Sequence, residues 1–334
     1  MEQNRPGATY WIDHYVIPVS DIERFDKFYT DVLGAKHRAM GGAGDAARRP
    51  QPGGERVLFT FVGDVHIGGA TKAEAPPASK GLGAGMPRYS YYVRPEDINE
   101  HLRRLDQFQV PHTDAIRTSE EGEDGTAIRF EDPDGNQLEF WAPVNMPAGA
   151  MADETAVKVG RVGSAVFESR DLGRTADFYT ELCGLDALTN ADVASDMLVL
   201  KMAAGGHLTF KKVDTLSERT GGHIHPLHTA LVVREDEMMK VYQKMWDRLP
   251  EWDHDPVIRR RLPTEETQQL PARVGIHGSP SGQPWRSAFL RGDSFWDWDT
   301  NAFHWVPAEP VDGSMAAPKT KSVWPYIEAQ RTGN

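Results

Sequence analysis

Histidine is the residue type that offers the most chemistry in this chain. The 334 residues include 12 histidines and a single cysteine, Cys183. An imidazole can bind iron, nickel, copper or zinc, and it can exchange a proton near neutral pH. A lone histidine is more often a hydrogen-bonded core or surface residue than a ligand. The histidines are therefore informative only where the fold brings several of them together, so the elements that carry them come next.

Composition and charge restrict the class of protein. Hydrophobic residues make up 39% of the chain and charged residues 26%, which is typical of a water-soluble globular protein. The 49 acidic residues outnumber the 37 basic ones, a balance that argues against nucleic acid or an anionic membrane as partner. One cysteine cannot form an internal disulfide, and no run has the length of a signal peptide or membrane span. We expect a cytoplasmic protein, with a homodimer as one option.

Two sequence patterns recur along the chain. Residues 21–34, DIERFDKFYTDVLG, return at 171–184 as DLGRTADFYTELCG. Residues 132–141, DPDGNQLEFW, return in weaker form at 297–306 as DWDTNAFHWV. A pattern that recurs in the same order predicts two copies of one module.

The repeat predicts four parts of the chain. The first module would occupy residues 1–147 and the second residues 158–310. The stretch between them, 148–157, lies in the segment that begins Met-Pro-Ala-Gly-Ala at residue 146 and has the composition of a linker. Residues 311–334 would form a C-terminal tail.

Each module contains two similar units. The first unit begins with an extended segment at 12–19, followed by a helix between the N-cap Asp21 and the stop signal Gly34. Strands at 56–62 and 65–67 follow across a Gly-Asp turn. The second unit repeats this order from residue 88, with a helix at about 95–106 and strands near 127–131 and 137–141. The pattern predicts an α+β fold of βαβββ units, four in all.

The FYTDVLG and DPDGNQLEF segments resemble the vicinal oxygen chelate superfamily. This superfamily includes glyoxalase I, extradiol dioxygenases, fosfomycin-resistance enzymes and bleomycin-binding proteins. The resemblance covers nearly the whole chain and implies curved mixed sheets, each formed by two units. In the family the concave side of such a sheet, called the cup here, holds a divalent metal. The ligands lie on the first and last strands of each unit, while the reaction differs from member to member.

Side-chain alternation selects the residues of those strands that face a cup. The eight positions are His14, His66, Arg88 and Glu139 in the first module, and Ser164, His207, His228 and His304 in the second. Composition alone would place roughly 0.3 of a histidine among eight positions, whereas five of these are histidine. The sequence therefore predicts a metal-ligand set.

The units can pair in two ways. If each module forms its own cup, as in the dioxygenase-like arrangement, the first cup contains His14, His66 and Glu139. Two histidines and a carboxylate suit non-haem Fe(II). The second module would then offer three histidines, His207 among them.

If the units exchange partners between modules, as in the glyoxalase-like arrangement, the sets differ. One cup then holds His14, His66, His228 and His304, and the other holds Arg88, Glu139, Ser164 and His207. In the latter, Arg88 and Glu139 would form a salt bridge and no metal would bind. We favour the exchanged pairing, because it separates one complete ligand set from one incomplete set, and keep Glu139 and His207 as alternative ligands.

Arg88 and four further residues are candidates for catalysis or substrate binding. Tyr92 lies four residues after Arg88 and should share its strand face, so it could act as an acid or base. His225, close to His228, is the other candidate for proton transfer. Arg88, Trp298 and Trp305 are candidates for binding an aromatic substrate, although tryptophans in this region can equally serve core or dimer packing.

The resemblance implies a metal-dependent dioxygenase that acts on a catechol-like substrate and O2. Fe(II) is the favoured metal, with Mn, Zn or Ni as alternatives. A glyoxalase-like lyase or isomerase, in which the metal polarises an enediolate, is the second candidate. A drug- or metabolite-binding protein of the bleomycin-resistance type is the third, and the five cup histidines argue against it.

Overall fold

The computed structural model describes residues 9–36, 57–63, 65–71, 81–82, 86–181, 183–188, 196–203, 205–216, 228–234, 295–296 and 302–308. At residues 57, 66, 228, 233–234, 295–296, 302 and 304–308 only the backbone is described. Within these segments, no helix is long and apolar enough to cross a membrane.

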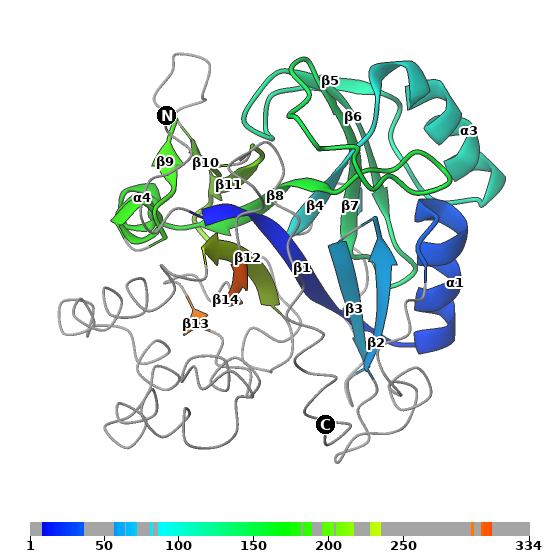
Figure 1. The fold of residues 1–334 in the computed structure, drawn as a ribbon, viewed down its shortest axis with the longest axis horizontal. Helices are drawn as coiled ribbons and strands as arrows, with labels where there is room; N and C mark the ends of the chain where they lie inside the picture. Colours follow the sequence, from blue (N-terminus) through cyan, green and yellow to red (C-terminus); the bar gives the residue numbers. More distant parts are fainter. Residues whose placement is uncertain are drawn as a thin grey trace.

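The strands form two mixed sheets (Figure 1). The first sheet has six strands, in the order β13 (Phe295–Trp296), β14 (Ala302–Ala308), β12 (His228–Arg234), β1 (Thr9–Val19), β3 (Val65–Thr71) and β2 (Val57–Val62). The second sheet has eight, in the order β5 (Ile116–Thr118), β6 (Gly125–Glu131), β7 (Gln137–Pro143), β4 (Arg88–Tyr92), β8 (Val162–Ser169), β11 (His207–Lys212), β10 (Met197–Lys201) and β9 (Asp186–Ala187). The expected α+β class, with curled mixed sheets and few helices, is confirmed.

Each sheet takes strands from both halves of the sequence. Strand β1 pairs antiparallel with β12, and β4 pairs antiparallel with β8. The first unit of the chain therefore shares a sheet with the last one, and the two middle units share the other sheet. This is the exchanged pairing. The four-part division of the sequence stays a prediction.

Helices cover the face of the sheets opposite the cups. Helix α1 (Ile22–Leu33) begins at Asp21, whose carboxylate accepts a hydrogen bond from the Arg24 amide at 2.9 Å, and ends at Gly34 with φ 67°. Both ends agree with the sequence-based prediction. In the second unit, the short helix η2 (Pro95–Asp97) leads into α3 (Ile98–Gln107). Arg104 of α3 donates to main-chain carbonyls in the last turn of α1, including that of Val32 at 2.8 Å, and so joins the two helices.

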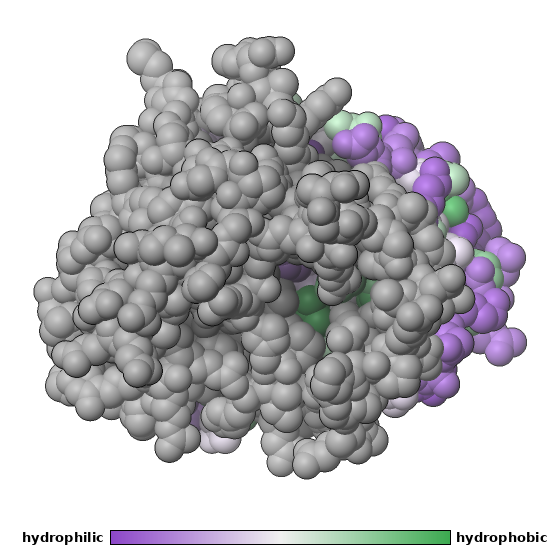
Figure 2. All heavy atoms as spheres, turned by 60° about the horizontal axis from the view of Figure 1, so that its bottom comes forward, coloured by the Kyte–Doolittle hydropathy of each residue, from purple (hydrophilic) through white to green (hydrophobic). Residues whose placement is uncertain are grey.

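The helices lie at opposite sides of the molecule. Helices α1 and α3 are side by side at one side, whereas α4 (Leu172–Glu181) packs on the end strands of the second sheet at the other (Figure 1). Hydrophilic residues gather on the described surface at the side that carries α1 and α3 (Figure 2). Each helix buries one face against a sheet and leaves its polar face outward, as an amphipathic helix does.

A buried tyrosine cluster joins the two sheets. The rings of Tyr15 on β1 and Tyr89 on β4 stack with their centroids 3.7 Å apart, and Tyr89 Oη lies 2.7 Å from Thr229 Oγ1 on β12. Neighbouring side chains of a strand point to opposite faces. Residues 14 and 90 therefore lie on the faces turned away from this shared core, so the two cups open away from each other.

His101 is a core histidine rather than a ligand. It is buried on α3, its ring centroid lies 4.5 Å from that of Phe140, and neither ring nitrogen has a hydrogen-bond partner among the described residues. Burial lowers the pKa of His101 to about 4. The folded chain therefore keeps this imidazole neutral.

Because His101 is buried without a hydrogen-bond partner among the described residues, we expect the fold to lose stability in acid. Unfolded, the imidazole takes up a proton near pH 6.5, whereas in the fold it resists protonation down to about pH 4. Its contribution to the free energy of unfolding is complete above pH 6.5 and is lost as the pH falls toward 4. Urea titrations measure the free energy of unfolding at each pH. Between pH 7 and pH 4 this free energy should therefore fall by roughly 2–3 kcal/mol less in His101→Leu than in the native chain. An equal loss in both proteins would contradict this account.

Candidate functional site

The register of the first sheet places the predicted ligands in one row. His14 on β1 pairs with His66 on β3 and with Ala230 on β12, and Ala230 pairs with His304 on β14. His228 lies two residues before Ala230 on the same strand. Paired positions, and positions two apart on one strand, share a sheet face. All four predicted histidine positions are therefore on one face, which we call the first cup, although only the backbone is described at 66, 228 and 304.

His14 has the environment of an oriented metal ligand. The side chain is buried, and its Nδ1 atom lies 2.7 Å from Oδ2 of the buried Asp13. A histidine that binds a metal through one ring nitrogen commonly donates a hydrogen bond from the other nitrogen to a carboxylate. Coordination by His14 would therefore use Nε2. The donor types in this row fit a divalent transition metal.

The side chains that the structure describes include no group of three or more His, Cys, Asp or Glu arranged to hold a metal. Three of the four predicted ligands fall outside that set, because their side chains are not described. The ligand assignment therefore rests on backbone register and on His14, and stays a prediction.

The second sheet repeats the same layout with other residues. Ser90 on β4 pairs with Glu139 on β7 and with Ser164 on β8, and Ser164 pairs with His207 on β11. Arg88 lies two residues before Ser90, as His228 lies two before Ala230. These residues form the second cup. The exchanged pairing thus divides the eight sequence candidates between the cups as expected for it.

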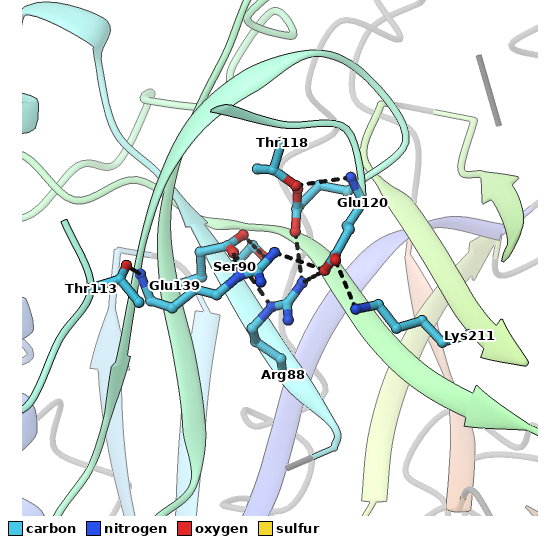
Figure 3. A network of polar contacts seen from close by, with 9 residues as sticks. Arg88, Ser90, Thr113, Thr118, Glu120, Glu139 and Lys211 are labelled. Carbon is cyan, nitrogen blue, oxygen red and sulfur yellow. Dashed lines mark hydrogen bonds and ion pairs between the residues drawn. The ribbon is translucent and has the colours of Figure 1, made fainter. Parts of the chain in front are cut away.

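A buried ion network occupies the second cup (Figure 3). Arg88 is fully buried, and its Nη2 atom donates to Glu120 at 2.7 Å and to Glu121 at 2.9 Å. Its Nε atom lies 3.4 Å from Oε2 of Glu139, so the predicted salt bridge between these two residues is confirmed. Arg129 also contacts Glu139, at 3.1 Å.

The rest of the network completes this charge balance. Lys211 on β11 and Arg129 on β6 each contact Glu120, at 2.8 and 2.7 Å, and Ser90 Oγ donates to Glu139 at 2.8 Å. Partial burial opposes ionisation of Glu120, but the combined attraction of Arg88, Lys211 and Arg129 outweighs it and lowers the pKa to about 2. For Glu121, burial and then repulsion from Glu139 raise the pKa well above its usual range.

The loop at 119–124 was not among the sequence-based candidates. Its sequence, SEEGED, is typical of a solvated acidic turn, yet Glu121 is fully buried against Arg88. At Gly122, φ is 101°, and a Cβ atom would lie 2.5 Å from Cγ of His207. Burial lowers the pKa of His207 to about 4. The one sequence signal was indirect: a permanently charged arginine predicted inside a cup requires acidic partners.

The other predicted site residues are not gathered in the first cup. Tyr92 ends β4 in the second sheet, where its ring stacks on Trp141 with centroids 5.4 Å apart, and burial raises its pKa well above the ordinary value. Arg88 likewise belongs to the second cup. Trp305 pairs with Leu231, in the row that alternates with that of His304. His225 and Trp298 lie outside the described residues, and these catalytic and substrate-binding roles stay predictions.

A substitution at Gly122 tests whether the loop at 119–124 packs against His207 in the second cup. Gly122→Ala should destabilise the fold by about 2–4 kcal/mol, because the methyl group meets His207 in addition to backbone strain. Gly81 is a matched control, with φ 99° and nothing within 4 Å of a Cβ atom. The free energy of unfolding of Gly81→Ala should fall by only about 1 kcal/mol. Chemical unfolding of both variants measures the difference. Equal losses would mean that the loop does not pack against His207.

Comparisons with known proteins agree with this architecture. Residues 11–140 match the Glyoxalase/Bleomycin resistance protein/Dioxygenase superfamily. No curated protein sequence matches the chain. A solved structure from Bacillus subtilis, named as a candidate dioxygenase, is 22% identical, covers 72% of this chain and 75% of its own, and has a TM-score of 0.53.

Two further solved structures are more distant. Glyoxalase I from Zea mays is 16% identical over 71% of this chain and 80% of its own, with a TM-score of 0.46. The fosfomycin resistance protein FosX from Mesorhizobium loti is 15% identical over 39% of this chain and 90% of its own, with a TM-score of 0.28. These low scores support no argument about function, and the Bacillus subtilis structure supports the fold alone. Residues 11–140 of the chain thus match this superfamily, and the Bacillus subtilis structure shares the fold.

Proposed function

We propose that the chain is a metal-dependent dioxygenase. In this proposal the first cup binds one divalent metal through His14, His66, His228 and His304. The substrate is a small aromatic molecule with two neighbouring oxygen atoms, cleaved with O2. The observation that carries the proposal is the row of histidine positions across β14, β12, β1 and β3.

The sheet order favours this ligand set over the alternative within the first module. Strands β1 and β3 belong to the first sheet, whereas β7, which carries Glu139, belongs to the second. The carboxylate of Glu139 is also held by Ser90 and Arg129. A set of His14, His66 and Glu139 is therefore divided between two cups. His207, on β11 of the second sheet, is likewise in a different cup from His14.

The four neutral imidazoles favour an anionic substrate. They would leave the metal with its full positive charge, which attracts two neighbouring oxygens of a deprotonated catechol-like ring. When bound, the metal supplies this attraction and, as Fe(II), the redox chemistry that O2 requires. Mn, Zn and Ni suit the same donors, so the choice of iron follows from the proposed reaction.

The chain's own residues orient the site and move the proton. Asp13 holds Nδ1 of His14 and thereby sets the direction of the ring. The proton of the substrate hydroxyl is assigned to His225, three residues before His228. Tyr92 is the weaker candidate, because β4 belongs to the second sheet and the buried phenol has a raised pKa.

A lyase or isomerase of glyoxalase type is the second candidate. The exchanged pairing of units favours it, because the resemblance associates that pairing with glyoxalase-like members. Such a reaction needs a base beside the metal to move a proton between carbons. Among the described strand positions of this row, residues 14, 66, 230 and 304 include no carboxylate, which is why the dioxygenase is preferred.

Metal analysis of variants tests the proposed centre. The native chain should hold about one metal equivalent, which His14→Ala and His228→Ala lose and Glu139→Gln keeps. After loading with Fe(II), the native chain should consume catechol and O2 together, whereas an isomerase would consume no O2. Loss of metal in Glu139→Gln with retention in His228→Ala would contradict the exchanged centre. No metal under any loading condition would leave the binding protein as the remaining function.

Asp13 tests the orientation of His14. Asp13→Asn keeps the size of the side chain but removes the negative charge that faces Nδ1 of His14, so metal affinity should fall about 10–100-fold. Competition with a chromophoric chelator measures that affinity. Asp134→Asn, in the turn between β6 and β7, is the control and should bind metal like the native chain. Similar affinity in both variants would show that Asp13 does not act through His14.

A further inference from the structure

We propose that Arg88 is a built-in cation that takes the place of a metal in the second cup. With the guanidinium removed, the cup would accept one divalent cation through Glu121, Glu139 and His207. The native second cup is then a closed ionic site that the chain fills itself. This inference concerns the second sheet only and does not depend on the function proposed for the first cup.

The register supports an equivalent site in the second sheet. Glu139 lies where His304 lies in the first sheet, and His207 lies where His66 lies. Glu139 and His207, whose side chains can both bind a metal, thus occupy positions equivalent to two of the histidine positions of the first cup. Arg88 corresponds to His228, so the residue that replaces a ligand brings a permanent positive charge to the same cup.

The surroundings of the guanidinium are those of a cation site. Three carboxylates approach it, those of Glu120 at 2.7 Å, Glu121 at 2.9 Å and Glu139 at 3.4 Å, and the side chain is fully buried. Arg129 and Lys211 balance part of this negative charge from the rim. Removal of Arg88 would leave buried carboxylates without their central cation, a state that strongly disfavours the fold unless another cation enters.

Two buried polar atoms on this face point to a ligand beyond the acidic residues. His207 Nδ1 and Ser164 Oγ have no hydrogen-bond partner among the described residues, and both residues are buried. The low pKa of His207 keeps its imidazole neutral, with a lone pair for a cation. The loop brings the two sides together, because Glu121 contacts Arg88 and the next residue, Gly122, packs against His207.

A purely structural ion pair is the competing explanation. In that case the carboxylates need only a guanidinium-shaped partner, and a metal ion would not replace it. With Arg88 in place, the described side chains include no group of three that could hold a metal, which is consistent with both explanations. The two explanations differ in which added cation, a metal ion or guanidinium, restores the thermal stability of an Arg88 variant.

Cobalt binding to Arg88→Ala tests the proposal. The metal-stripped variant, titrated with Co²⁺ and followed by visible absorption and equilibrium dialysis, should bind about one equivalent more than the native chain. The expected result is a difference, so it holds whether the native chain binds one Co²⁺ or none. Arg94→Ala, which removes an exposed arginine paired with Glu154, is the control and should bind no additional Co²⁺.

A double variant identifies the ligands. The additional Co²⁺ should disappear in Arg88→Ala/Glu139→Gln. An additional equivalent that survives Glu139→Gln is an adventitious ion only and overturns the proposal. So does a folded Arg88→Ala variant that binds no more Co²⁺ than the native chain.

Thermal unfolding separates the metal from the guanidinium. Arg88→Ala should melt about 10 °C below the native chain, and 1 mM Co²⁺ should restore most of that loss. Restoration by 10 mM guanidinium but not by Co²⁺ would establish the structural ion pair instead. Should Arg88→Ala fail to fold, Arg88→His offers an imidazole at the same position. Failure of both variants to accumulate in cobalt-supplemented cells would show that a metal cannot replace the guanidinium.

Discussion

The antiparallel pairing of β1 with β12 is the constraint on which the rest of the structure depends. It joins strands from opposite ends of the chain and brings residues 14, 66, 230 and 304 into one row. The side-chain period of a strand is two residues, so a shift of one residue in this pairing would move the histidine positions of β12 and β14 to the core face. The corresponding pairing of β4 with β8 forms the second cup. The buried stack of Tyr15 on Tyr89 joins the two sheets.

The two cups show how one backbone layout can carry opposite electrostatics. In the first cup the row contains histidine positions, with Asp13 beside His14. In the second cup a buried arginine is surrounded by carboxylates. A guanidinium and a metal dication repel each other at short range in a low-dielectric interior. The charge of Arg88 therefore opposes metal binding in the second cup, and this is why the proposed metal centre is assigned to the first cup.

The features that the sequence predicted well are local ones. The bounds of α1 follow from the Asp21 cap and the αL residue Gly34, which act within one helical turn. Alternation along β4 and β7 correctly placed Arg88 and Glu139 on the same face. The contacts of Glu121 could not be predicted, because an acidic loop has no periodicity and its partner lies 33 residues away in the sequence.

The sequence by itself determined the α+β fold class, the strand faces and the residue types available to each cup. These follow from cap residues, from side-chain alternation and from two recurring segments, all readable over short stretches of chain. Only the tertiary structure decided which units share a sheet, because both pairings satisfy the same local pattern. It also decided that the 119–124 loop seals the second cup. Such choices depend on hydrogen bonds and charges between residues remote in the sequence, which appear only once the sheets are assembled.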